Sequence, residues 1–113
     1  MNDRIDIDWE QLHQVSEDDP EFELELLTML AEDVKIHIED LRQAVNENDA
    51  VKIAHEAHYI KGASANVGIT SIAALAKQIE NLARDRQLAD INPQIDRMAI
   101  DLGYLETYIT TRT

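Results

Sequence analysis

Apolar side chains recur at intervals of three and four residues along most of this chain, which is the spacing of amphipathic α-helices. The longest such run begins at Asp19-Pro20, because Asp is a favoured N-cap and Pro is favoured in the first turn. It continues for about seven turns, to Asn46. The pattern therefore predicts one long helix whose inward positions are Phe22, Leu26, Leu27, Leu30, Val34, Ile38, Leu41 and Val45.

A second long helix is predicted over residues 49–67. Asn48 or Asp49 is suited to cap its start, and Gly68 is suited to end it, because glycine readily adopts the left-handed conformation common after a helix. The apolar stripe of this helix consists of Ile53, Ala57, Ile60, Ser64 and Val67. Since that stripe is a usable core face, the other face is expected to meet solvent or a partner.

Two further long helices and one short helix complete the pattern. The third long helix starts at Thr70 or Ser71 and fades over residues 87–90; its inward positions are Ile72, Leu75, Ala76, Ile79, Leu82 and Ala83. The fourth repeats the cap-plus-proline start at Asn92-Pro93; its inward positions are Ile95, Met98, Leu102, Leu105 and Ile109. A short helix over about residues 6–15 is also predicted, with Trp9 covering an end of the core and with Ile7, Leu12 and Val15 inward.

The connections between the long helices are short, and short connections make successive amphipathic helices antiparallel neighbours. The predicted fold is therefore all-α: an up-down antiparallel four-helix bundle with a short N-terminal helix. A chain of 113 residues can bury one core but not two. We expect a single domain over residues 1–113, with the core bundle at about 19–110 and an N-terminal addition at 1–18.

The composition excludes several classes of function. The chain has no cysteine, so neither a disulfide framework nor a thiolate zinc site is possible. No apolar run approaches the ~20 residues that span a bilayer, and the N-terminus does not have the pattern of a signal peptide. With only three glycines, a glycine-rich phosphate loop is improbable. We therefore expect a cytoplasmic protein that is not a nucleotide-binding enzyme. We also expect a monomer.

The charge is unevenly distributed along the chain. The net charge of −13 disfavours nucleic acid and anionic membranes as partners, because both require a positive surface. Residues 52–86 nevertheless hold five basic and three acidic residues, a net charge of +2, whereas the rest of the chain carries −15. This segment is therefore suited to an acidic partner site or a bound phosphate.

The solvent-facing side of the second helix combines small residues with two functional ones. His58 and Lys61 are three residues apart and so are neighbours on the helix surface. Gly62 costs about 1 kcal/mol relative to Ala in a helix, which suggests that something approaches closely there. The residues expected on this face are Val51, Ala54, His55, His58, Lys61, Gly62 and Ala65.

The segment His58-Tyr59-Ile60-Lys61-Gly62, preceded by Ala57 and followed six residues later by Gly68, resembles the signature of histidine-containing phosphotransfer (HPt) domains. The resemblance extends over about residues 19–109, nearly the whole chain. It implies that His58 accepts a phosphoryl group from a receiver-domain aspartate, or from a histidine kinase, and passes it to another receiver. It also implies that Lys61 screens phosphate charge and that Gly62 leaves room for the docking receiver.

The resemblance assigns further residues. Gly68 matches the helix-ending glycine of the family, and Glu80 stands where family members carry a Gln or Glu bonded to the imidazole; the glutamate is more like the phosphotransfer domain of chemotaxis kinases than free-standing relay proteins. No cofactor or metal of its own is expected, and Mg²⁺ is expected on the receiver partner. The docking surface is expected to comprise Val51, Ala54, His55, Gly62, Ala65, Lys77 and Arg84.

Counting residues also places Glu80 beside His58. Residues 49–67 and 70–87 run antiparallel through a tight turn, and the two positions lie ten residues before and twelve after Gly68, at similar heights. A carboxylate there can accept the Nδ1 proton and leave Nε2 as the nucleophile. The alternative is a surface carboxylate paired with Lys77 or Arg84, at i−3 and i+4.

Two other functions stay open. One is a helical adaptor that docks receiver domains without carrying phosphate. The other is a metal-dependent bundle enzyme, for which Glu10-x-x-His13 supplies only one of the two motifs required. Of the remaining histidines, His55 is expected at the rim of the docking surface and His37 as a partly buried packing residue.

Overall fold

The computed structural model describes residues 5–113; the first four residues of the predicted N-terminal addition lie outside them. The described part is all-α, as predicted, and none of its helices is long and apolar enough to cross a bilayer. Its helical elements are α1 (Trp9–Val15), α2 (Pro20–Asn46), α3 (Ala50–Asn66), α4 (Thr70–Arg84), the 3₁₀ turn η1 (Leu88–Asp90) and α5 (Asn92–Arg112).

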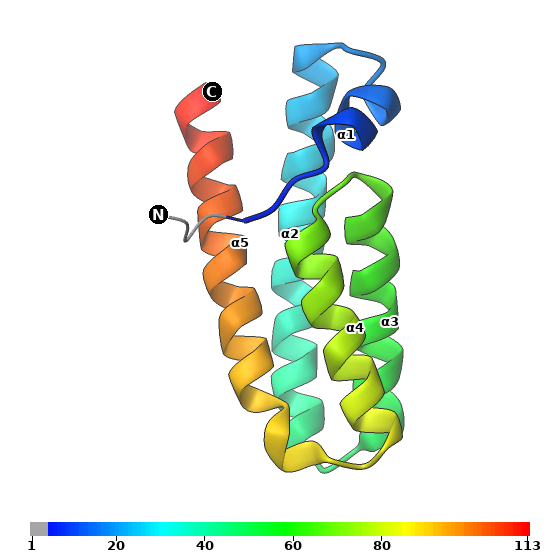
Figure 1. Ribbon diagram of the computed structural model, residues 1–113. Helices are drawn as coiled ribbons and strands as arrows, with labels where there is room; N and C mark the ends of the chain where they lie inside the picture. The colour runs from blue at the N-terminus through cyan, green and yellow to red at the C-terminus, as the bar shows by residue number, and fades with distance from the viewer. Residues whose placement is uncertain (1–4) are drawn as a thin grey trace.

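Helices α2 to α5 form an up-down bundle in which each runs antiparallel to the next, and α5 closes the ring against α2 (Figure 1). This arrangement confirms the predicted architecture. Helices α3 and α4 are the shorter pair, and α1 lies across the end of that pair where their connection emerges. The long axis of the molecule measures 42 Å and the other two 24 and 23 Å.

Side-chain caps start α2 and α3 where the sequence predicts. Asp19 accepts hydrogen bonds from the backbone of Glu21 and Phe22, which opens α2. Asp49 caps α3, since its carboxylate accepts from the Lys52 N–H. The predicted cap at Asn92 is wrong: Asn92 is already the first helical residue of α5, the N-cap is Ile91, and no side chain bonds to this helix start.

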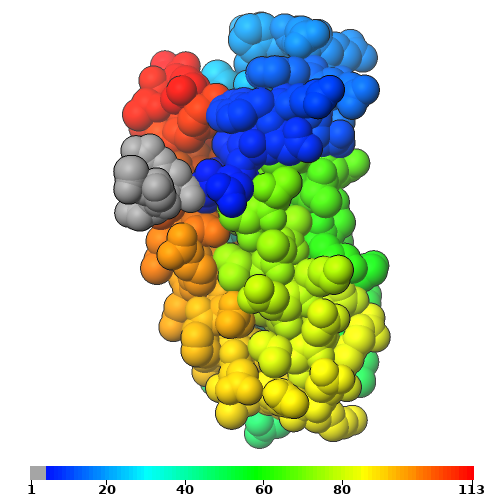
Figure 2. Space-filling view, viewed as in Figure 1, coloured from blue at the N-terminus to red at the C-terminus, as the bar shows by residue number. Residues whose placement is uncertain are grey.

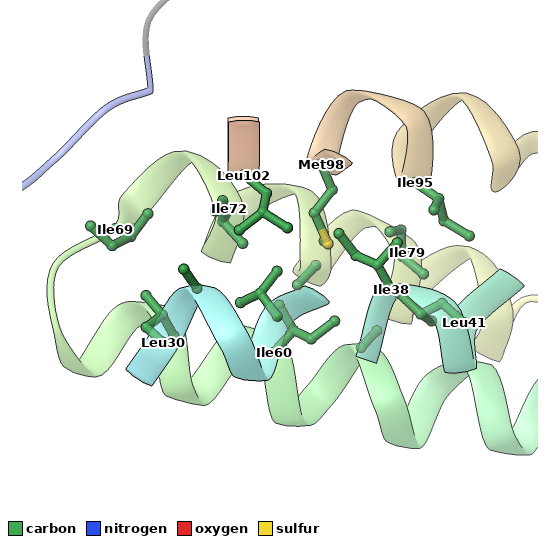
Figure 3. Packing of buried hydrophobic residues seen from close by; sticks show 14 of the residues in the cluster. Leu30, Ile38, Leu41, Ile60, Ile69, Ile72, Ile79, Ile95, Met98 and Leu102 are labelled. Atoms are coloured by element: carbon green, nitrogen blue, oxygen red, sulfur yellow. The ribbon is translucent and has the colours of Figure 1, made fainter. Parts of the chain in front are cut away.

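The core lies between all four long helices and is built from aliphatic side chains of each. Figure 3 shows side chains of α2, α3, α4 and α5 pointing toward one another. The predicted inward positions are mostly buried, but Phe22 is 38% exposed because it lies in the first turn of α2, beyond the main packing layer. Fully buried large side chains include Leu27, Leu41, Ile53, Ile60, Ile72, Ile79, Ile95, Met98 and Leu105.

The N-terminal segment differs from its prediction. The helix begins at Trp9 and not near Asp6, and Ile7 pairs with Ile69 in an isolated antiparallel bridge. The carbonyl of Asp6 accepts hydrogen bonds from the backbone N–H and hydroxyl of Thr70, at 3.1 and 3.2 Å. The segment therefore supplies the capping that the start of α4 does not receive from its own N-cap side chain. In Figure 2 the dark blue segment lies against the yellow-green residues at the start of α4.

Trp9 does not cover the core as predicted. The residue is 43% exposed, and its ring contacts those of His13 and Tyr108, with centroid distances of 6.0 and 5.7 Å. The core contact of α1 is made instead by Leu12, which is fully buried. The short helix is thus held by Leu12 in the core, by Val15 packed beside it, and by surface contacts that include the ring of Tyr108 on α5.

Candidate functional site

His58 is an exposed residue on the middle of α3, where Ile53, Ala57 and Ile60 turn inward and fix which face of the helix remains outside. Its side chain is 65% exposed. Its Nδ1 atom lies 3.1 Å from Oε2 of Glu80 on α4. The predicted proximity of these two residues is therefore present in the structure.

Glu80 is buried: only 6% of its side chain is accessible. Its position on the inward side of α4, between Ile79 and Ala83, accounts for this. An ionised carboxylate can only accept hydrogen bonds, so Nδ1 of His58 carries the proton in this contact. Nε2 then bears the free lone pair on the exposed side of the ring, which is the atom able to act as a nucleophile toward another molecule.

Two cations complete the contacts of Glu80. Lys61 Nζ lies 3.1 Å from Oε1, and Arg84 Nη2 donates to Oε2 at 2.7 Å. The alternative pairing with Arg84 therefore coexists with the His58 contact, whereas the pairing with Lys77 is not found among the described residues. Lys61, expected to meet phosphate, is bonded to this carboxylate in the structure.

The pKa of Glu80 reflects opposing influences. Burial of the carboxyl disfavours its charged form and would raise the pKa, but hydrogen bonds from Arg84, Lys61 and His58 outweigh it and lower the pKa from 4.5 to about 2. The carboxylate therefore remains ionised throughout the physiological pH range and acts as a permanent acceptor.

This lowered pKa makes part of the stability dependent on pH. The ionised form is favoured by folding, so its contribution is fully present above pH 4.5 and is lost as the pH falls toward about 2. We expect wild type to exceed a Glu80→Gln variant in unfolding free energy by on the order of 1–2 kcal/mol at pH 6, and this difference to shrink steadily below pH 5. Urea unfolding of both proteins across pH 3–7 measures it, and a difference independent of pH would contradict the assignment.

A groove of about 510 Å³ runs along α3 and α4 beside His58. Of the expected docking residues, Val51, Ala54, His55 and Arg84 line it, whereas Gly62, Ala65 and Lys77 do not. Ala54, which was expected on the solvent-facing side of α3, is only 8% exposed, because the groove that it lines is bordered by larger side chains. The lining consists of Ala50, Val51, Ala54, His55, His58, Ala83, Arg84 and Arg86.

Three lining residues were missed by the sequence analysis: Ala50, Ala83 and Arg86. Ala83 was assigned only to the core, and Arg86 follows α4 in a left-handed conformation, with φ of 58°, that no local signal identifies. The excess of basic residues over positions 52–86 was the one available indication. The groove combines small apolar walls with two guanidinium groups, so it is suited to a partner with an acidic rim.

The two glycines near the site differ in their surroundings. A Cβ at Gly62 would meet nothing within 4 Å, so the surface beside Lys61 is open. Gly68 has φ of +83°, and a Cβ there would lie 2.7 Å from the carbonyl oxygen of Asp8. Gly68 therefore ends α3 as predicted, and it also allows the N-terminal segment to approach.

Two of the other histidines, His13 and His37, have carboxylate partners within the fold. His13 pairs with Glu23 at 3.0 Å, and His37 on α2 bonds to Glu56 on α3 while stacking on Tyr59 at 4.2 Å. His37 is thus partly buried, as predicted, with an ion-pair partner that was not predicted.

One group of potential metal ligands occurs among the described residues. His37, Asp40 and Glu56 each offer a ligand atom within 4.8 Å of the others. Glu56 is already engaged by His37. The contact is sufficiently explained as a link between α2 and α3.

Comparison with known proteins adds to this geometry. A family model described as Hpt domain matches residues 25–110. The structure is similar to the crystal structure of histidine-containing phosphotransfer protein B (HptB) from Pseudomonas aeruginosa PAO1, with a TM-score of 0.86 and 24% sequence identity. That similarity covers 94% of this chain and 92% of the other. No curated protein matches the chain. At this identity the structural likeness establishes the fold, and the family match spans most of the chain.

Proposed function

The chain belongs to the Hpt domain family, whose members are phosphocarrier modules of phosphorelays, and on this basis we propose that His58 accepts a phosphoryl group from a receiver-domain aspartate or a histidine kinase and passes it to another receiver. The observation that supports this most directly is an exposed imidazole whose Nδ1 is held by the buried Glu80. The proposed role is that of a carrier and not of an enzyme.

The proposed step is a direct transfer between two proteins. The Nε2 lone pair of His58 attacks the phosphorus of an aspartyl phosphate, the N–P bond forms, the acyl P–O bond breaks and the aspartate leaves as a carboxylate. The phosphoramidate has a comparable transfer potential, so the reverse step loads a second receiver. Exposure of the ring is necessary because the phosphorus under attack lies on another molecule.

The chain's own residues contribute position and charge to this step. Glu80 orients the ring through Nδ1, and Lys61 supplies a positive charge near the phosphoryl oxygens. We propose that the chain acts as a monomer without a cofactor of its own and that Mg²⁺ is supplied by the receiver. Receiver domains and a hybrid or separate histidine kinase are the proposed partners.

A transfer assay tests the proposal. Incubation of the protein with a receiver domain carrying labelled aspartyl phosphate is expected to move label to this chain in an acid-labile, base-stable form, as a phosphoramidate requires. Receivers that bind but transfer no label would instead support the helical adaptor. The set of receivers that accept label in the reverse direction identifies the partners.

Docking is proposed over the groove and the adjoining open surface at Gly62. Because a Cβ at Gly62 meets nothing within the chain, Gly62→Gln is expected to keep the fold and to gain helix propensity. The longer side chain should obstruct an approaching receiver and slow transfer about tenfold or more, by misplacing the reacting atoms.

Gly103→Gln is the matched control, because Gly103 is also a helical glycine with open space around it and lies on α5. Circular dichroism of both variants checks the fold, and transfer rates with receiver affinities separate docking from chemistry. Equal transfer rates for wild type and both variants would show that the receiver docks elsewhere.

A further inference from the structure

Arg84 contacts the same oxygen of Glu80 as His58 does. We propose that it is a positioning residue for phosphoryl transfer, which acts on His58 through the carboxylate that both side chains share; this inference rests on the proposed function of His58. Arg84 lies on α4, one turn after Glu80, and its side chain is 62% exposed. It also lines the groove beside His58.

Arg84 and His58 share one oxygen of the Glu80 carboxylate. Oε2 of Glu80 receives both Arg84 Nη2, at 2.7 Å, and His58 Nδ1, at 3.1 Å, whereas Lys61 Nζ approaches Oε1. Charge-assisted bonds to a carboxylate are stronger than neutral ones, so the arginine contact sets the plane of the carboxylate. The lone pair left on Oε2 then fixes the direction in which the imidazole can donate.

The charge balance gives Arg84 a second effect. Glu80 carries −1, and Lys61 and Arg84 carry +1 each, so the group beside the neutral ring has a net charge of +1. A positive environment disfavours a second proton on the imidazole and preserves the Nε2 lone pair. Without Arg84 the remaining pair is neutral, and a protonated, non-nucleophilic ring becomes easier to form.

The other charged groups near His58 lie further along the groove or behind the helix. His55 on α3 and Arg86 after α4 line the groove without a hydrogen bond to Glu80 among the described residues. The charged groups of α2 meet the opposite side of α3, where Asp33 accepts from Tyr59 and His37 bonds to Glu56. Arg84 and Lys61 are therefore the cations placed to act through this carboxylate.

Arg84 also suits the phosphorylated state. A phosphoryl group on Nε2 brings about two negative charges close to the carboxylate of Glu80. The guanidinium on Oε2 reduces the repulsion between them while its remaining N–H groups stay available on the exposed side. The same residue thus favours a neutral ring before transfer and a charged product after it.

The test compares Arg84→Gln, Arg84→Lys and Arg86→Gln, all at exposed positions where the helical fold should persist. The midpoint of the His58 ring titration, followed by NMR, should shift to higher pH in Arg84→Gln. It should return toward the wild-type midpoint in Arg84→Lys and stay unchanged in Arg86→Gln. Glu80→Ala should move it in the opposite direction. These readouts need no receiver, so they remain valid even if the transfer assay fails.

Single-turnover transfer provides the second readout. Arg84→Gln is expected to slow phosphorylation of His58 about threefold to tenfold at neutral pH, the range for loss of one solvent-exposed charge near the ring. Part of this loss should recover as the pH rises, because the ring then returns to its neutral form.

An unchanged titration and tautomer in Arg84→Gln would overturn the inference. The inference would be overturned even if transfer in this variant were slower because the receiver binds more weakly, since Arg84 would then act in docking alone. Absence of transfer in wild type would overturn the function of His58 and leave the titration result to decide whether Arg84 acts on the ring.

Discussion

A His58→Gln protein is expected to take up no phosphoryl group from a phosphorylated receiver. Glutamine retains a side chain of similar reach and hydrogen-bonding capacity, but it has no nucleophilic nitrogen that can form a phosphoramidate. Because His58 is exposed and its ring contributes one surface contact to Glu80, the variant should fold as wild type does. The label measured on the chain should therefore fall to background without a loss of helicity.

His55→Gln is the matched control for this result. His55 lies on the same exposed face of α3 and lines the same groove, but no carboxylate orients its ring among the described residues. We expect it to accept label close to the wild-type amount, with at most a modest change in receiver affinity. Label on His58→Gln, or label that maps to His55 in wild type, would refute the assignment of the acceptor.

Of the three possible glycine-to-alanine substitutions, Gly68→Ala is expected to destabilise the protein most. The backbone there has φ of +83°, and the added Cβ would lie 2.7 Å from the Asp8 carbonyl oxygen and 3.3 Å from the Leu12 nitrogen. Both neighbours are backbone atoms, which cannot rotate away. We expect a loss of about 2–4 kcal/mol in unfolding free energy, from the left-handed strain and the displaced N-terminal segment together.

Gly103→Ala adds the same methyl group but is expected to stabilise the protein. Gly103 lies inside α5, and a Cβ there meets nothing within 4 Å, so alanine should stabilise the protein by about 0.5–1 kcal/mol. Urea unfolding of the two variants measures both effects. Equal stabilities would show that the contact of Gly68 with residues 8–12 does not hold the N-terminal segment in place.

The Gly68 variant also bears on transfer. Asp8 N–H donates to the Gly68 carbonyl at 2.7 Å, and Ile69 starts the next helix directly afterwards. This connection sets the register of α3 against α4, and that register brings Glu80 opposite His58. If Gly68→Ala remains folded at low temperature, its transfer should be slower than wild type because the register is disturbed.

The predictable part of the fold was local. Periodicity and caps such as Asp19 identified the four long helices, because these signals arise within one or two turns of chain. The errors over residues 6–15 lie where contacts between distant segments decide the outcome. Ile7 bridges Ile69, and the Trp9 ring packs at an angle against the ring of Tyr108. Both partners lie far away in the sequence, so no local pattern indicates either contact.

Some features of the site could likewise be predicted from the sequence, and others depended on tertiary packing. The sequence by itself determined the helical face that presents His58 and Lys61, and counting from Gly68 placed Glu80 level with the histidine, since helix geometry and a tight antiparallel turn leave little freedom. Tertiary packing decided that Glu80 is buried with its pKa lowered to about 2 and that Arg84 shares its oxygen with His58. Those outcomes depend on side-chain contacts between two helices, whose angstrom-scale distances no periodic pattern along one chain encodes.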